Sequence, residues 1–113
     1  MARKKTFVVD PENVEWEPVE EYEGRAWRKV LSRDEETGAM ATLFRVDKGF
    51  HSPRHKDPYG VHIMMLEGGG VVDEKGTEVK KGMYWFIPAG VEHGPIDIPE
   101  GCLAFIYFTG PPE

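Results

Sequence analysis

Short stretches of the chain alternate hydrophobic and polar residues with a period of two, which is typical of β-strands with one buried face. In residues 39–48, the side chains of Met40, Thr42, Phe44 and Val46 would share one face. Residues 25–32 precede this stretch across turn-forming residues, so the pattern predicts a β-hairpin. Three further strands are predicted between turn signals, at residues 61–73, 77–80 and 83–87.

Residues 102–108 are apolar at both odd and even positions. A strand of this kind is expected to be covered on both faces, as in a sandwich or closed barrel. The chain also contains 13 glycines and 9 prolines, which favour tight turns, and no stretch predicts a helix longer than a turn or two. With 113 residues, the chain is expected to form one all-β domain.

The charge distribution excludes some classes of partner. The net charge is −6, and the single basic cluster is Arg3, Lys4 and Lys5, so the surface lacks the positive charge that nucleic-acid binding requires. No apolar run is long enough to cross a membrane and no signal peptide is recognisable, so a cytoplasmic location is expected. The single cysteine, Cys102, lies in an apolar run and is expected to be a buried, inert thiol.

The N-terminal part of the chain differs from the rest in composition. Residues 10–23 contain seven carboxylates, no Lys or Arg, and two prolines that interrupt any helical pattern. We expect residues 1–23 to form an acidic arm with an edge strand, anchored by Val14, Trp16 and Val19. Residues 24–113 would then form the barrel.

All four histidines lie in the middle of the chain, and this clustering indicates a metal site. His55 and Asp57 are two residues apart, so in an extended segment their side chains would project from the same face, roughly 6 to 7 Å apart at Cα. His93 follows a Pro-x-Gly turn. Two histidines and one carboxylate leave coordination positions open, which suits Fe(II) and also Mn, Ni or catalytic Zn.

Two motifs give the chain a resemblance to the cupin superfamily. The first cupin motif contains a Gly, a His-x-His pair, a Glu and a second Gly. Its spacing is matched without gaps by Gly49, His55, Asp57, Val61 and Gly68.

The second cupin motif runs Gly, Pro-x-Gly, His and Asn. Gly82, Pro88, Gly90 and His93 match in place, and Asp97 replaces the Asn. The resemblance covers roughly residues 24–110. It implies a double-stranded β-helix, or jelly-roll barrel, with a divalent metal ion bound inside.

The departures from the first motif change the expected ligand set. Asp57 stands where the second histidine usually is and can still bind a metal, whereas Val61 replaces the glutamate ligand and cannot. His55 and His93 are the ligands that the resemblance carries over. A further ligand could come from His62, if a bulge near Pro58 and Gly60 turned it inward, or from His51.

The cavity lining is expected to be mostly apolar. If Val61 faces inward, then Ile63 and Met65 do too. One of two sets from the second motif would join them, either Met83, Trp85 and Ile87 or Tyr84 and Phe86. Such a pocket accepts a small ligand whose oxygen atoms can chelate the metal. The hydroxyl group of Tyr59 is a candidate hydrogen-bond donor at the barrel mouth.

One branch of the superfamily has sequences that resemble residues 28–49, 60–68, 71–76 and 88–95 of this chain. This branch contains dihydroxyacetophenone dioxygenase, acetylacetone dioxygenase and the zinc-binding cupin domain of anti-sigma factors. This resemblance implies a dioxygenase-like enzyme that uses Fe(II) to cleave a small carbonyl compound. The alternatives are a non-catalytic metal or ligand sensor and a metal-dependent isomerase or lyase.

A 2-oxoglutarate oxygenase is disfavoured because no Lys or Arg follows His93 to bind the cosubstrate carboxylate. A homodimer is also predicted.

Overall fold

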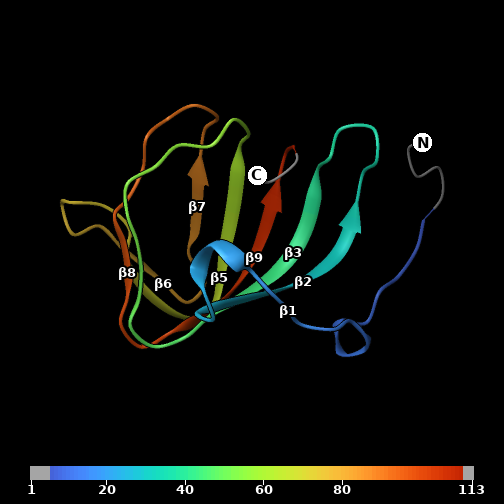
Figure 1. The fold of residues 1–113 in the computed structure, drawn as a ribbon, viewed down its shortest axis with the longest axis horizontal. Coiled ribbons are helices and arrows are strands. Elements are labelled where there is room, and N and C mark those ends of the chain that lie inside the picture. The colour runs from blue at the N-terminus through green and yellow to red at the C-terminus, as the bar shows by residue number, and fades with distance from the viewer. Residues whose placement is uncertain (1–5, 111–113) are drawn as a thin grey trace.

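The computed structural model describes residues 6–110, which form short antiparallel strands and two short 3-10 turns (Figure 1). The basic cluster of Arg3, Lys4 and Lys5 lies outside the described residues. In chain order, the elements are η1 (Pro11–Asn13), β1 (Glu17–Pro18), η2 (Glu20–Tyr22), β2 (Ala26–Arg33), β3 (Met40–Val46), β4 (Phe50–Ser52), β5 (Val61–Val71), β6 (Glu78–Lys80), β7 (Tyr84–Ile87), β8 (Ile96–Ile98) and β9 (Cys102–Phe108).

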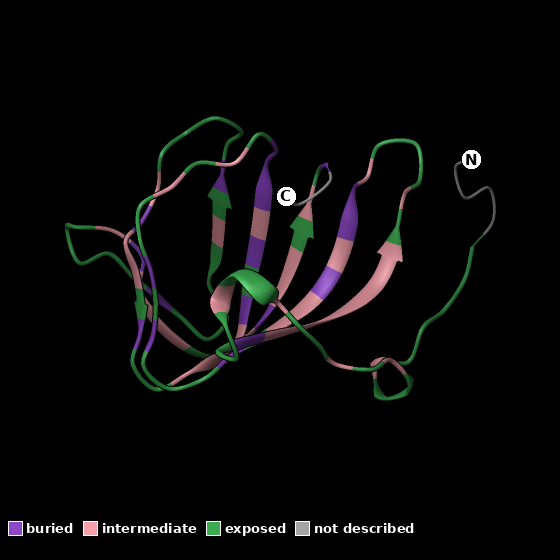
Figure 2. Ribbon diagram, in the orientation of Figure 1, coloured by how far each residue is buried: buried purple, intermediate pink, exposed green. Residues whose placement is uncertain are grey.

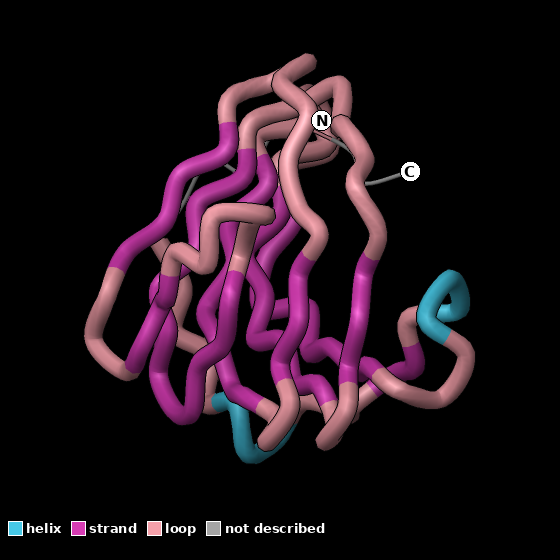
Figure 3. The backbone as a smooth tube through the Cα atoms, turned by 90° about the vertical axis from the view of Figure 1, so that its left-hand side faces the viewer, coloured by secondary structure: helices cyan, strands magenta, loops and turns pink. Residues whose placement is uncertain are grey.

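The strands form a curled sheet in which β5 is shared between two halves. One half contains β1, β2, β3, β9, the first part of β5 and β7, with antiparallel pairing between neighbours. The last residues of β5 pair with β6 and β8, and β8 pairs with β4. The side view shows the resulting curvature (Figure 3). This architecture confirms the predicted all-β cupin fold.

Three consecutive glycines allow β5 to change partners. A Cβ atom on Gly68 would collide with the carbonyl oxygen of Gly101, and one on Gly69 would collide with the carbonyl oxygen of Val79. At Gly70 the obstacle would be the carbonyl oxygen of Asp97. The backbones of β9, β6 and β8 therefore approach β5 closely because these positions carry no side chain.

The predicted alternation of buried and exposed residues is clear in β3. Met40 and Thr42 are fully buried and Val46 is nearly so, whereas Arg45 is exposed. The Thr42 hydroxyl donates a hydrogen bond to the backbone carbonyl of Ile106 on β9, at 2.9 Å. This bond allows a polar side chain to lie in the core. Figure 2 shows the same alternation along β5.

Two expectations about strands differ from the structure. The outer face of β9 is not covered, since Tyr107 is 38% exposed even though the strand is apolar at both parities. Strands β4 and β8 were not predicted, because three residues are too few to show a period.

The N-terminal arm packs along β2. β1 pairs with β2 as an edge strand, and the Trp16 ring lies against the Lys29 Nζ atom at 4.9 Å and the Arg45 guanidinium at 4.8 Å. These cation–π contacts anchor the arm outside the sheet. Among the described residues, no helix is long and apolar enough to cross a membrane.

Candidate metal centre

Two loops carry the predicted metal ligands. His55 and Asp57 lie between β4 and β5, and His93 lies between β7 and β8. Neither loop forms a regular strand, but one bridge joins them, in which His55 and His93 exchange backbone N–H···O hydrogen bonds of 3.0 and 2.8 Å. Pro53 and Pro95 lie two residues before His55 and two residues after His93, and a proline has no N–H group to continue a ladder.

Further contacts fix the two loops to each other. The Arg54 side chain makes ion pairs with Glu92, at 2.8 Å, and with Glu74. The Gly90 N–H group donates a hydrogen bond to the Asp57 carbonyl oxygen at 2.7 Å. Because each ligand-bearing loop is tied to the other, the ligand side chains are positioned before any ion binds.

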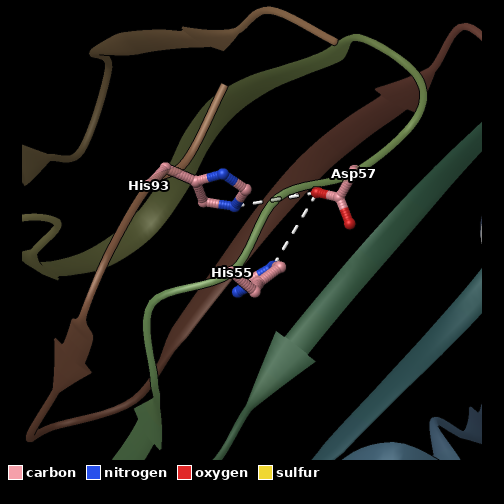
Figure 4. Close-up of side chains that lie close together, drawn as sticks. All are labelled: His55, Asp57 and His93. Atoms are coloured by element: carbon pink, nitrogen blue, oxygen red, sulfur yellow. Dashed lines mark ion pairs between the residues drawn. The ribbon is translucent and has the colours of Figure 1, made fainter. Parts of the chain in front are cut away.

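The side chains of His55, Asp57 and His93 converge on one point (Figure 4). The Nε2 atoms of both histidines lie 3.7 Å from the same Asp57 carboxylate oxygen, Oδ2. One ligand atom from each residue lies within 4.8 Å of the other two. His93 is the most buried of the three side chains, with 10% of its surface exposed, compared with 20% for Asp57 and 35% for His55.

Hydrogen bonds at Nδ1 set the tautomer of each ring. The Nδ1 atom of His55 lies 3.0 Å from the Pro53 carbonyl oxygen, and that of His93 lies 3.3 Å from the Val91 carbonyl oxygen. A carbonyl oxygen only accepts, so Nδ1 carries the hydrogen and Nε2 presents its lone pair toward Asp57.

The electrostatic environment also favours a neutral imidazole at position 93. Burial lowers the pKa of His93 and the neighbouring His55 lowers it further, while the Val91 carbonyl and Asp57 act in the opposite direction. His93 is therefore unprotonated at neutral pH and its Nε2 atom is available as a ligand. Two imidazole nitrogens and one carboxylate oxygen are a donor set that could hold a divalent metal ion.

A cavity of about 160 Å³ lies beside the three side chains. Its wall includes Val61, Ile63 and Met65, which share one face of β5, and Tyr59, which precedes that strand. Of the two alternatives on β7, Trp85 and Ile87 line the cavity, whereas Tyr84 and Phe86 are exposed on the outer face. Cys102 also lines it, and burial raises the pKa of this thiol to about 11, so the thiol is neutral and unreactive.

Comparisons with known proteins identify the family and the fold of this chain. Residues 4–111 match the family described as the ChrR cupin-like domain. The chain belongs to this cupin family. No curated protein matches the sequence of this cupin.

Solved structures that resemble this cupin share its fold. An RmlC-like cupin from Shewanella frigidimarina is 24% identical, with a TM-score of 0.76 over 100% of this chain and 96% of that one. A putative acetylacetone dioxygenase from Methylibium petroleiphilum is 19% identical, with a TM-score of 0.79 over 97% and 81%. The polyketide cyclase RemF from Streptomyces resistomycificus is 25% identical, with a TM-score of 0.75 over 96% and 83%.

The other two histidines of this cupin lie away from the centre. His62 is on the outer face of β5, where its Nδ1 atom lies 2.6 Å from the Tyr84 hydroxyl and its ring packs on Phe86. The pairing of β5 with β7 and β9 is regular from Val61 to Met64, so no bulge turns His62 inward. The structure therefore does not bring His62 to the metal-ligand group.

His51 has a different partner. Its Nδ1 atom lies 2.7 Å from an Asp97 carboxylate oxygen, and both side chains are 55% exposed. His51 and Asp97 face each other across the β4–β8 pair. This outer pair is thus separate from the group formed by His55, Asp57 and His93.

Sequence reasoning did not predict that the N-terminal arm and β2 line the cavity of this cupin. Val19, Glu21 and Tyr22 come from the N-terminal arm, and Arg28 comes from β2. Arg28 is two residues from Ala26, which is fully buried, so it occupies an inward position of that strand. A charged residue at the buried parity of a strand was the available signal. The arm gave no comparable signal, because its residues follow no regular period.

Proposed function

We propose that this cupin is a metal-dependent enzyme that acts on a small carbonyl compound in a dioxygenase-like reaction. The observation that supports this proposal is the convergence of His55, Asp57 and His93 beside an apolar cavity of about 160 Å³. A closed cavity of about 150 Å³ holds benzene, so a cavity of this volume accommodates at least a small molecule of that size.

The three converging residues would hold the ion and present one negative charge between them. A divalent metal bound there supplies a Lewis acid for a carbonyl oxygen and, as Fe(II), a centre for reaction with dioxygen. The apolar side chains of Val61, Ile63 and Met65 exclude water from the substrate. Trp85, whose ring lies 6.4 Å from that of His93 in an edge-on arrangement, restricts the orientation of the imidazole.

Metal analysis and oxygen uptake test the proposal together. The protein, purified without chelators and loaded with Fe(II), is expected to consume oxygen when given simple β-diketones or hydroxyketones. Asp57→Ala should lower metal occupancy by about tenfold or more, because it removes a charged ligand. Asp97→Ala is the matched control, since it removes a carboxylate from the outer His51–Asp97 pair.

The outcomes test metal binding and catalysis separately. Equal metal occupancy in the Asp57→Ala variant and the wild-type protein would contradict the role of Asp57 as a ligand. Metal binding without oxygen uptake on any of these compounds would contradict the dioxygenase-like reaction.

A sensor is the second candidate function, and the composition of the cavity wall favours it. Val19 and Tyr22 contribute to the wall and belong to the exposed acidic arm, so a ligand in the cavity contacts the arm directly. Bound zinc, no turnover and ligand-dependent protection of the arm from proteolysis would support this function. Fe(II)-dependent turnover would exclude a purely non-catalytic role.

We also propose that the protein is a homodimer. The outer faces of β5, β7 and β9 expose large apolar or aromatic side chains at Met64, Tyr84, Phe86 and Tyr107, each at least 38% exposed. A contiguous face of this kind is typical of an interaction surface. A second copy of the chain packed there would cover the outer face of β9, which the sequence pattern predicts to be buried.

A further inference from the structure

The cavity has a second charged region besides the metal-ligand group. Arg28 is the only Lys or Arg among the described residues that line it. The Arg28 side chain is 24% exposed, although a guanidinium is always protonated and costly to bury without partners. A cation is therefore held in the wall of an otherwise mostly apolar cavity.

The ion pair of Arg28 uses only part of its guanidinium. Its Nε atom donates a hydrogen bond to Glu17 Oε1 at 3.0 Å, and Glu17 lies directly opposite on β1. Within residues 6–110, neither terminal nitrogen of Arg28 has a hydrogen-bond partner. These two nitrogens form the planar fork that binds a carboxylate with two parallel hydrogen bonds.

We propose that Arg28 binds the carboxylate of the substrate, so that the substrate class is small oxo acids. The orientation of the substrate, with its carbonyl oxygen toward His55, Asp57 and His93, rests on the proposed function. The inference that the other end of the substrate is a carboxylate rests on Arg28 alone.

Neighbouring charges limit the substrate to a monoanion. Glu17 already compensates part of the positive charge of Arg28, and Glu21 also lines the cavity. A second negative charge on the ligand would face both carboxylates. Apolar side chains, including Phe44 and Val46, line the same cavity, so a short hydrocarbon segment fits between the two polar ends of the substrate.

Matched pairs of ligands test this assignment. In each pair, an oxo acid is compared with a diketone in which a methyl group replaces one carboxylate oxygen. The pairs are acetoacetate with pentane-2,4-dione, 4-oxopentanoate with hexane-2,5-dione, and 5-oxohexanoate with heptane-2,6-dione. Dissociation constants are measured by titration calorimetry with metal-free and zinc-loaded protein. The best acid is expected to bind about tenfold or more tightly than its diketone, because it gains charge-assisted hydrogen bonds.

Substitutions at Arg28 attribute that preference to a residue. Arg28→Gln should abolish the difference between acid and diketone, and Arg28→Lys should retain part of it as a point charge without the planar fork. Arg33→Gln, on the same strand with an exposed side chain, removes the same charge and should leave the preference unchanged. Circular dichroism of each variant verifies folding, and Arg28→Lys keeps the test valid if Arg28→Gln does not fold.

Several results would overturn the assignment of Arg28. They are equal affinity for acid and diketone in every pair, no binding of any acid at millimolar concentration, and a preference for acids that survives Arg28→Gln. A protein that binds no metal would contradict the proposed function, but the acid preference of the metal-free form would still decide the role of Arg28. The two failures are therefore distinguishable.

Discussion

The four histidines of this cupin divide into an inner pair, His55 and His93, and an outer pair, His51 and His62. In all four rings, Nδ1 makes a hydrogen bond. In the inner pair, His55 and His93, Nδ1 is bonded to a backbone carbonyl two residues earlier. In the outer pair, Nδ1 is bonded to a side chain, the Asp97 carboxylate for His51 and the Tyr84 hydroxyl for His62.

This difference explains why only the inner pair suits a metal ion. A carbonyl of the same loop has no side-chain freedom to lose, so it fixes the ring rigidly and leaves Nε2 directed at the shared carboxylate of Asp57. The side-chain partners of the outer histidines are more than half exposed, since Asp97 has a 55% exposed side chain and Tyr84 is also 55% exposed. Orientation of the ring, rather than clustering in the sequence, therefore distinguishes a candidate ligand from a surface histidine.

The largest expected effect comes from removing one histidine at a time. We expect His93→Gln and His55→Gln to lose most of the bound metal at equimolar metal concentration, because each loses one of only three ligands. His51→Gln and His62→Gln should bind metal as the wild-type protein does. Competition titration with a zinc-sensitive dye measures all four affinities, and a loss of metal affinity in His62→Gln similar to that in His93→Gln would contradict the distinction.

A substitution on the inner face of β5 should destabilise the protein more than a substitution on its outer face. Ile63 faces the cavity and is 6% exposed, whereas its neighbour Met64 faces outward and is 39% exposed. Ile63→Ala is expected to lower the free energy of unfolding by about 2 kcal/mol or more, and Met64→Ala by less than about 1 kcal/mol. Urea unfolding monitored by tryptophan fluorescence gives both values. Equal losses would show that Ile63 is not part of a packed wall.

Much of the fold could be predicted because long strands display their period. Strands β3 and β5 each contain seven or more residues with alternate buried positions, and their limits match the prediction closely. The three-residue strands β4 and β8 were missed, because their pairing depends on neighbouring strands rather than on their own pattern.

The candidate site was only partly predictable for a related reason. The cupin motifs contain His55, Asp57 and His93, so their spacing could be compared with a known pattern. Arg28 and Tyr22 belong to no motif and reach the cavity only because β2 and the arm fold against it. Their contribution depends on tertiary contacts between distant segments, which spacing does not encode.

The smallest effect on the stability of a single chain is expected on the outer face, where association should change instead. The Phe86 side chain is 46% exposed and packs on the ring of His62, so Phe86→Ser should lower the free energy of unfolding by less than about 1 kcal/mol.

If the outer face joins two copies, the same substitution should convert a dimer into a monomer, because it removes a large apolar contact from the centre of the face. Light scattering coupled to size-exclusion chromatography measures the mass of both proteins. Val91→Ser, a change at another exposed apolar residue outside β5, β7 and β9, is the control and should remain dimeric. A monomeric wild-type protein would contradict the proposed dimer, and a dimeric Phe86→Ser variant would contradict the assignment of this face.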